Sequence, residues 1–395
     1  MPSVKTGHPF LFQTSITKSD ASTVVGTGET RTELWKLNSD PVVMPLSPEM
    51  YEDDNESGKS SNMSEAAPIR IKSAWGRTLN MVADDHALAY WPFWASHGDG
   101  GGNGTSNQTV IGSTVGYQGH WSGPVGDVAD VKAIDAEEIT TGSTAYASLV
   151  ENIVVPSVEI TVPQSGVATV APTLLGSGRV TSSASATSCT NRRAKVFTRA
   201  HMHVLLSATL GYDGDATYET TAFTDAPTAA NAVTKTLLNG TPVNIGAYTT
   251  QANVRFLNGI NLDASYTTGV ADGDGAAVVG HGGWIRDSAA QQIEFEFTFL
   301  QGASATITNQ RAAFDAGTQQ GVEFWLWHPD PYETGAYAGF RVTCGFAKPQ
   351  GEITTGVDGF GHATWTCRYR AQYSTSDLVG WYLLTSSQMT TSLGG

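Results

Sequence analysis

Hydrophobic and polar residues alternate strictly between Gln292 and Leu300. Ile, Phe, Phe and Phe occupy every second position of this stretch, and Glu294, Glu296 and Thr298 lie between them. Since successive side chains of a β-strand point to opposite faces, the pattern predicts a strand with one aromatic face and one polar face. The aromatic face would pack into a core, and the acid-bearing face would meet water.

Weaker forms of the same two-faced pattern predict further strands, mostly in the second half of the chain. They fall in residues 69–75, 158–162, 195–206, 260–266, 322–327, 340–346 and 363–373. Turns that contain Gly and Pro separate them at intervals typical of a β-sandwich. The pattern therefore predicts a mainly β chain with the strand spacing of a sandwich.

A few short helices interrupt the predicted strands. Asp84 and Asp85 mark one helix start, because acidic residues are favourable at the positive end of a helix, and Pro92 limits or kinks that helix after about two turns. Two more candidates are residues 225–238, with Pro227 in the first turn, and residues 312–316, stopped by a glycine. We expect one or two short helices beside the sheets.

The first 66 residues show no sustained period and contain an acidic cluster followed by a serine-rich run. This composition predicts a largely irregular N-terminal arm over residues 1–66, ordered by a neighbour, and a single β-rich domain over residues 67–395. The arm nevertheless contains several large apolar residues, which is more than a pure linker carries. They are Phe10, Phe12, Leu34, Trp35, Leu37 and Leu46.

Charge narrows the possible partners. The 395 residues contain 37 Asp and Glu against 22 Lys and Arg, a formal net charge of -15. Such a chain is not expected to grip densely anionic nucleic acid, and an acidic surface would repel it; alternatively, the acidity serves solubility.

Sequence signals for secretion and membrane insertion are missing. The N-terminus lacks the apolar core of a signal peptide, and no run approaches the roughly 20 apolar residues of a membrane span. The three cysteines are too few for a disulfide-built scaffold, and Cys344 and Cys367 fall on apolar strand faces, where buried thiols are expected. We expect a chain made in a cytoplasm without a membrane anchor.

Catalytic and metal-binding patterns were sought and none is complete. His201 and His203 could share a strand face, but spacing identifies no third metal ligand. The Asp-Gly pairs at Asp213 and Asp272 resemble calcium-loop fragments that do not reach the required Glu, and turn formation explains them. Glu294 and Glu296 could in principle act as acid and base, yet carboxylates two residues apart on an exposed strand simply lie side by side along one face. We expect no enzyme activity, no cofactor and no metal.

Element order and two-faced strands together suggest a family. An irregular arm precedes a helix with aromatic residues over 84–94 and a glycine loop over 98–104; a strand pair follows, with LVENIVVPSVEITVP starting at Leu149. Later come FLNGINLDASY from Phe256, the Ile293–Phe299 strand and FWLWHP from Phe324. This order over residues 66–385 resembles the tail tube (major tail) proteins of long-tailed bacteriophages.

The resemblance implies a structural virion protein whose subunit is a β-sandwich or half-barrel with one or two short flanking helices. Six copies would close a ring, and stacked rings would form a tube for genome passage, assembled in the host cytoplasm and located in the virion tail. Its partners would be other copies of the chain and the tape-measure, tail-terminator and tail-tip proteins, with viral DNA as a transient cargo bound without sequence specificity. Glu294 and Glu296 are the candidates to face an acidic lumen.

Two other readings stay open. The chain could be another β-rich virion protein of the shell, neck or decoration type. It could also be a carbohydrate-binding β-sandwich, because exposed Trp side chains stack on sugar rings. The candidates for such stacking are Trp91, Trp94, Trp121, Trp325 and Trp327, although a buried core position is the simpler expectation for most of them.

Overall fold

A computed structural model describes a large part of the chain. The described residues are 10–15, 33–39, 42–43, 49–51, 69–72, 75–95, 107–111, 114–122, 134–140, 146–176, 180–183, 195–213, 223–262, 266–271, 277–281, 284–286, 292–302, 304–372 and 378–386.

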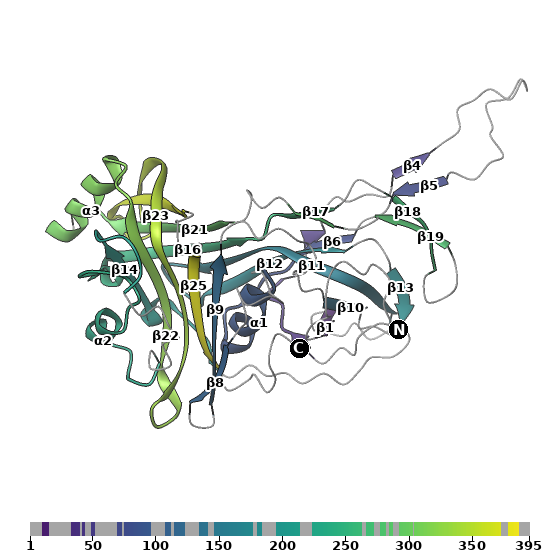
Figure 1. Ribbon diagram of the computed structural model, residues 1–395, viewed down its shortest axis with the longest axis horizontal. Coiled ribbons are helices and arrows are strands. Elements are labelled where there is room, and N and C mark those ends of the chain that lie inside the picture. The colour runs from purple at the N-terminus through teal and green to yellow at the C-terminus, as the bar shows by residue number, and fades with distance from the viewer. Residues whose placement is uncertain are drawn as a thin grey trace, which may run out of the picture.

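The described chain is mainly β, which confirms the predicted fold class (Figure 1). One antiparallel sheet of 19 strands accounts for most of it. Its strands up to residue 140 are β1 (Phe10–Thr14), β2 (Glu33–Trp35), β3 (Val42–Val43), β6 (Trp75–Thr78), β7 (Met81–Val82), β8 (Asn107–Ile111), β9 (Thr114–Ser122) and β10 (Ile134–Thr140). The remaining ones are β11 (Tyr146–Val162), β12 (Thr169–Gly176), β13 (Val180–Ser183), β14 (Met202–Ser207), β15 (Val243–Asn244), β16 (Thr249–Leu257), β21 (Gln292–Leu300), β22 (Gln320–Glu333), β23 (Ala336–Val357), β24 (Ala363–Ala371) and β25 (Leu378–Ser386).

Three two-stranded ribbons and a few short helices complete the described elements. The ribbons pair β4 (Glu49–Tyr51) with β5 (Ile69–Lys72), β17 (Ile260–Leu262) with β20 (Trp284–Arg286), and β18 (Tyr266–Ala271) with β19 (Ala277–His281). The α-helices are α1 (Asp85–Ala95), α2 (Ala229–Thr234) and α3 (Ala305–Asp315), and single 3-10 turns are η2 (Arg199–His201) and η3 (Gly246–Tyr248). None of the described helices is long and apolar enough to span a membrane.

The large sheet folds into two packed parts that share a strand. In one part the strands follow the order β12, β11, β16, β21, β24 and the second half of β23. In the other part they follow the order β14, β22, the first half of β23, β25 and β9. Figure 1 shows the strands of the second part running up the page and β11, β16 and β21 running across it.

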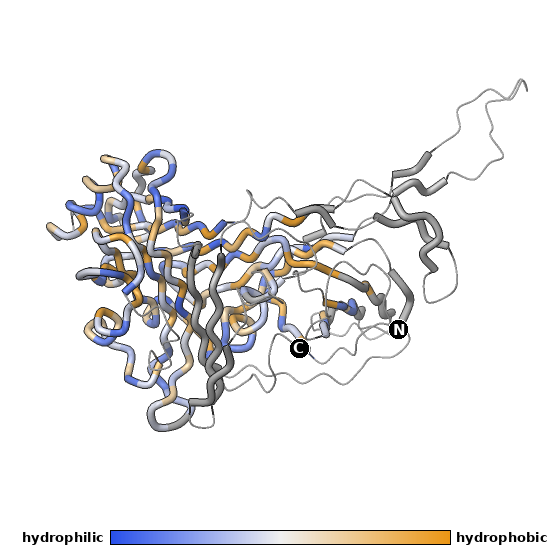
Figure 2. The backbone as a smooth tube through the Cα atoms, in the orientation of Figure 1, coloured by the Kyte–Doolittle hydropathy of each residue, from blue (hydrophilic) through white to orange (hydrophobic). Residues whose placement is uncertain are grey.

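One hydrophobic core joins the two parts. Phe256 on β16 contacts Phe340 on β23 edge to face, with the ring centroids 6.3 Å apart. The phenylalanines of β21 are buried in the same cluster as Phe324 of β22. Figure 2 shows the underlying alternation of apolar and polar positions along these strands.

Helix α1 lies inside this core rather than beside the sheets as expected. It contacts β11, β12, β16 and β25, and its described residues are buried. Its side chains after His86 are apolar around the helix, which is the pattern of a buried helix. Asp84 begins the helix as predicted, because its Oδ1 accepts the backbone N–H of Ala87 at 2.8 Å. The helix continues through Pro92 and spans 11 residues, one turn more than expected.

The other two helices differ from the prediction at their starts. Helix α2 begins after Thr228, whose hydroxyl accepts the N–H of Asn231, so Asp225 is not its cap. Helix α3 begins after Ser304, seven residues earlier than expected, and ends as predicted before Gly317, which has a φ of 67°.

Three segments of the predicted irregular arm, β1, β2 and β3, are strands of the large sheet. Strand β1 pairs with β10 and β2 pairs with β1, and both Phe12 and Trp35 are buried. Trp35 stacks on His86 of α1 at 4.3 Å, and Nε2 of His86 lies 2.8 Å from Oε2 of the buried Glu33. These three segments are therefore regular strands rather than irregular chain, and most of residues 1–66 lie outside the described residues.

A buried ion-pair network fixes the outer side of the second part. Glu323 on β22 accepts hydrogen bonds from the hydroxyl of Thr343 at 2.6 Å and the indole N–H of Trp325 at 2.8 Å. Arg341 on β23 lies with Nε 3.8 Å from Oε1 of Glu323 and donates to the carbonyl of Lys235 at 2.7 Å. Since both charged side chains are buried, each needs the other to offset its lost hydration.

This network predicts a large cost for removing one partner. Arg341→Met leaves the Glu323 carboxylate buried without its countercharge, so we expect a loss of roughly 3–5 kcal/mol in the free energy of unfolding. Urea unfolding followed by tryptophan fluorescence measures it. Arg311→Met on α3, where the ion pair with Asp315 is solvent-exposed, is the matched control and should change stability by less than about 0.5 kcal/mol. Equal losses in the two variants would contradict the assignment.

Candidate functional site

The candidate site is the outward side of strands β11, β16, β21, β24 and the second half of β23, which we call the polar face. On β21 the four apolar side chains point into the core, and Glu294, Glu296 and Thr298 point outward, as the sequence predicts. Glu294 and Glu296 therefore lie side by side on the polar face, each half-buried.

Strand register places these two carboxylates in two rows that cross the polar face. Glu294 lies between Arg255 of β16 and Arg370 of β24. That row continues to Glu159 of β11 on one side and to Lys348 of β23 on the other. Charges of opposite sign thus alternate across four neighbouring strands, an arrangement that stabilises cross-strand pairs.

The second row is centred on Glu296. Its neighbours in register are Asn253 of β16 and Arg368 of β24, followed by Gln350 of β23. Asn253 donates to Oε1 of Glu296 at 3.0 Å, and Nε of Arg368 donates to Oε2 of the same carboxylate. Both oxygens of Glu296 consequently have partners from the two adjacent strands.

Ion pairs in the first row are looser. Arg255 NH2 lies 3.2 Å from Oε1 of Glu159, and that hydrogen bond raises the pKa of Arg255, with a further contribution from the carboxylates of Glu296 and Glu294. Nε of Arg370 lies 3.7 Å from Oε1 of Glu294 and also donates to the side chain of Gln292.

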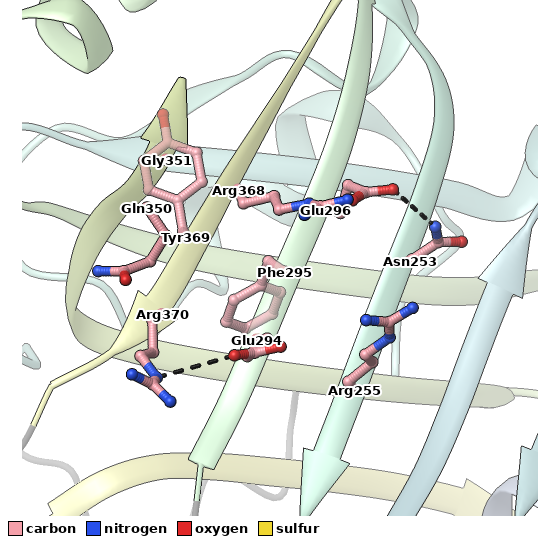
Figure 3. A pocket seen from close by; sticks show the side chains of 10 residues that line it. All are labelled: Asn253, Arg255, Glu294, Phe295, Glu296, Gln350, Gly351, Arg368, Tyr369 and Arg370. Carbon is pink, nitrogen blue, oxygen red and sulfur yellow. Dashed lines mark hydrogen bonds and ion pairs between the residues drawn. The ribbon is translucent and has the colours of Figure 1, made fainter. Parts of the chain in front are cut away.

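The guanidinium groups form the outer layer of these pairs. The exposed fraction of the side chain is 68% for Arg368 against 25% for Glu296, and 48% for Arg255 against 34% for Glu159. A hollow of about 240 Å³ opens among the side chains of both rows, lined by Arg255, Arg368, Arg370, Gln350 and the two central carboxylates (Figure 3).

Cations balance the carboxylates in these two rows, so the rows do not carry the net negative charge expected of this face. The two rows hold three Glu (159, 294 and 296) against three Arg (255, 368 and 370) and Lys348, so cations exceed carboxylates by one. Sequence alternation placed Glu294 and Glu296 on an outward face, and it placed Arg368 and Arg370 on one face of their strand. It did not show that these two strands are neighbours, because pairing between distant segments has no local signal.

The histidine and aspartate candidates do not form a metal site among the described residues. His201 lies in η2 with its ring 4.6 Å from that of His328, and Nδ1 of His203 lies 3.2 Å from the side-chain amide of Asn244. Of the two aspartates in the calcium-loop candidates, Asp213 lies within the described residues and Asp272 lies outside them.

Four of the five tryptophans that could have stacked on sugar are buried in the core. They are Trp91, Trp94, Trp325 and Trp327. The side chain of Trp121 lies outside the described part of the structure. Buried rings cannot contact a carbohydrate, so this observation removes most of the basis for that reading. Cys344 and Cys367 are buried free thiols, as expected, and burial raises the pKa of both.

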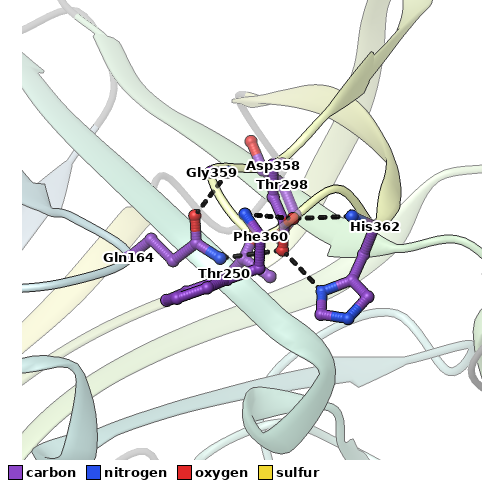
Figure 4. A network of polar contacts seen from close by, with 7 residues as sticks. All are labelled: Gln164, Thr250, Thr298, Asp358, Gly359, Phe360 and His362. Atoms are coloured by element: carbon purple, nitrogen blue, oxygen red, sulfur yellow. Dashed lines mark hydrogen bonds and ion pairs between the residues drawn. The ribbon is translucent and has the colours of Figure 1, made fainter.

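A network of hydrogen bonds braces the turn between β23 and β24 (Figure 4). The Asp358 carboxylate accepts the backbone N–H groups of Phe360 and His362 at 2.9 and 2.8 Å and the side-chain amide of Gln164 at 2.8 Å. This network ties the β23–β24 turn to the β11–β12 turn and leaves the ring of Phe360 73% exposed.

Comparison with known proteins identifies no relative: no protein-family model matches the chain, and no curated protein matches it.

The paired rows predict that a charge reversal on β21 is not neutral. Glu296→Lys places a cation next to Arg368, so a repulsive pair replaces a favourable one. We therefore expect a loss of about 1 kcal/mol in the free energy of unfolding. Chemical denaturation measures it. Glu352→Lys, the same reversal at an exposed position on β23, is the control and should stay within about 0.5 kcal/mol. A loss as small as that of the control would show that the rows do not couple.

The hairpin brace predicts a dependence on acid pH. Burial would raise the pKa of Asp358, but hydrogen bonds from His362, Phe360 and Gln164 outweigh it and lower the pKa from 3.8 to about 2. A carboxyl group with a lowered pKa in the folded state stabilises the protein above its ordinary pKa, and this contribution is lost as the pH falls toward 2. The melting temperature of Asp358→Asn should therefore lie below that of the wild type at pH 5, and the gap should close toward pH 2. A gap that is constant over this range would contradict the assignment.

Proposed function

We propose that the chain is a tail tube protein of a long-tailed bacteriophage, a structural protein without enzymatic activity. In this proposal six copies close a ring and stacked rings form a tube in the virion tail. The tape-measure, tail-terminator and tail-tip proteins are its further partners, and viral DNA passes through the lumen.

The observation that carries the proposal is the two-sided sheet around β21. The inner side of β21 packs into the core, and the outer side of the sheet bears charged and amide side chains from five neighbouring strands. A subunit of a tube wall needs such a sheet, because the lumen side must stay hydrated while the opposite side packs. In the proposal Glu294 and Glu296 face the lumen together with their arginine partners.

The charge balance changes the expected physics of the lumen. A strongly acidic wall would act by repulsion, whereas the two rows bring nearly equal numbers of both signs to the surface. Fields from closely paired opposite charges largely cancel beyond the Debye length of about 8 Å at physiological salt. DNA in the middle of the channel would thus experience little net force from this part of the wall.

Another β-rich virion protein remains the alternative, and assembly separates the two. Electron microscopy of the purified full chain should show six-fold rings or hollow tubes, and the mass of the ring should be a multiple of six subunits. Persistent monomers, or closed shells without tubes, would contradict the proposal.

A point variant tests which side of the sheet faces the lumen. Arg368→Ala removes the most exposed side chain of the ion pairs in the rows, so tubes should still form if the polar face lines the channel. Phe297→Asp on the opposite side of the same sheet is the control and should abolish folding and tubes alike, since it buries a charge in the core. Folded Arg368→Ala subunits that no longer assemble would place the polar face at a subunit interface instead.

A further inference from the structure

We propose that the polar face is a weak contact site for the phosphate backbone of nucleic acid, formed by Arg255, Arg368, Arg370 and Lys348 and restrained by the carboxylates beneath them. This inference rests on the proposed function, because it assigns how the wall of the tube meets its cargo. It replaces simple repulsion of DNA by a contact that forms and breaks easily.

The layering of the ion pairs supports the contact. Arg368 and Arg255 are more exposed than their glutamates, whereas Arg370 and Glu294 are about equally exposed. An approaching polyanion therefore meets the guanidinium groups of Arg368 and Arg255 first. A guanidinium group has five donors, and a bond to one carboxylate leaves others for a phosphate oxygen. Arg368 is the clearest case, with 68% of its side chain exposed while its Nε is held by Glu296.

The spacing of the cations suits an extended ligand. Arg368 and Arg370 are two residues apart on β24, roughly 7 Å along the strand, and the set reaches from β16 to β23 across three strand spacings, roughly 14 Å. Duplex DNA carries one charge per about 1.7 Å of its axis, so several phosphates can lie over the set at once. The hollow of about 240 Å³ is lined by the three arginines of this set (Figure 3).

The carboxylates set the strength of the contact. Glu159, Glu294 and Glu296 compete with phosphate for the same guanidinium donors and repel the phosphate itself. Exposed ion pairs are weak, so a phosphate can displace them transiently, but it cannot bind tightly while they remain. We therefore expect the wild-type face to bind DNA poorly and a face without its central carboxylates to bind it well.

The test removes those carboxylates and compares charge-matched variants of the full chain. Glu294→Gln/Glu296→Gln should bind a short fluorescent DNA duplex roughly tenfold more tightly than the wild type at about 50 mM salt, the scale set by two competing surface ion pairs. Asp225→Asn/Asp315→Asn, which removes two carboxylates that pair with Lys235 and Arg311 away from the polar face, has the same net charge and should bind like the wild type. Equal gains in the two variants would overturn the site, because net charge alone would then explain the binding.

Salt dependence counts the contacts. For the Glu294→Gln/Glu296→Gln variant, we plot the logarithm of the DNA-binding constant against the logarithm of the salt concentration. The slope should be about -3.6 if four cations contact phosphate. Adding Arg368→Gln and Arg370→Gln to the Gln variant leaves two of the four cations, and the slope should fall to about -1.8. An unchanged slope would place the contacts elsewhere and overturn the site.

Two further measurements identify the ligand and separate this inference from the proposed function. Polyglutamate of matched charge should bind the Gln variant more weakly than the duplex, and equal binding would point to an acidic protein segment and overturn the phosphate assignment. Microscopy of the same preparations scores tube formation separately. If tubes form but the Gln variant shows no gain in DNA binding, the contact site alone is refuted. If the Gln variant binds DNA as predicted but the chain forms no tubes, the tube is refuted.

Discussion

Strand β23 is the element on which the rest of the structure depends. Its first half pairs with β22 and β25 and its second half pairs with β24, so one continuous backbone belongs to both parts of the folded sheet. The change of partner falls at Ala347, which pairs with Gln320 of β22 and also with Ala371 of β24. Because hydrogen bonds fix both halves, the two parts cannot slide apart without breaking a ladder, and the aromatic core between them has one arrangement.

Core packing and the charged rows follow from the same register. A slip of one residue between β21 and β24 would turn Tyr369 outward and bring Arg368 and Arg370 toward the core. Burying a phenylalanine side chain contributes roughly 1.5–3 kcal/mol, whereas an exposed ion pair contributes about 0–1 kcal/mol. The phenylalanines of β21 therefore set the register, and the ion pairs are its consequence. Side chains on the polar face can consequently be selected for what they contact, at little cost in stability.

The sequence reveals features that depend on local pattern, but it does not reveal features that depend on pairing between distant segments. The strict alternation around Phe297 and the acidic start of α1 at Asp84 are local signals, and the structure confirms both. The burial of Trp35 against His86 could not be read this way, because it joins segments about 50 residues apart, although the apolar residues of the N-terminal stretch were a hint. Likewise, Glu294 and Glu296 read as an acidic surface until the neighbouring strands supplied their arginines.

Two kinds of ion pair in the same sheet show how burial changes their role. Glu323 and Arg341 are both enclosed. Several hydrogen bonds hold Glu323, and Arg341 donates to the carbonyl of Lys235, so losing either side chain leaves an uncompensated charge. Glu296 and Arg368 have the same chemistry on the polar face, but water reaches both and can replace either partner. The buried pair therefore serves the fold, while the exposed pairs can exchange partners. Since an exchangeable arginine can pass from a carboxylate to a phosphate and back, a wall built from such pairs can touch a moving polyanion without holding it.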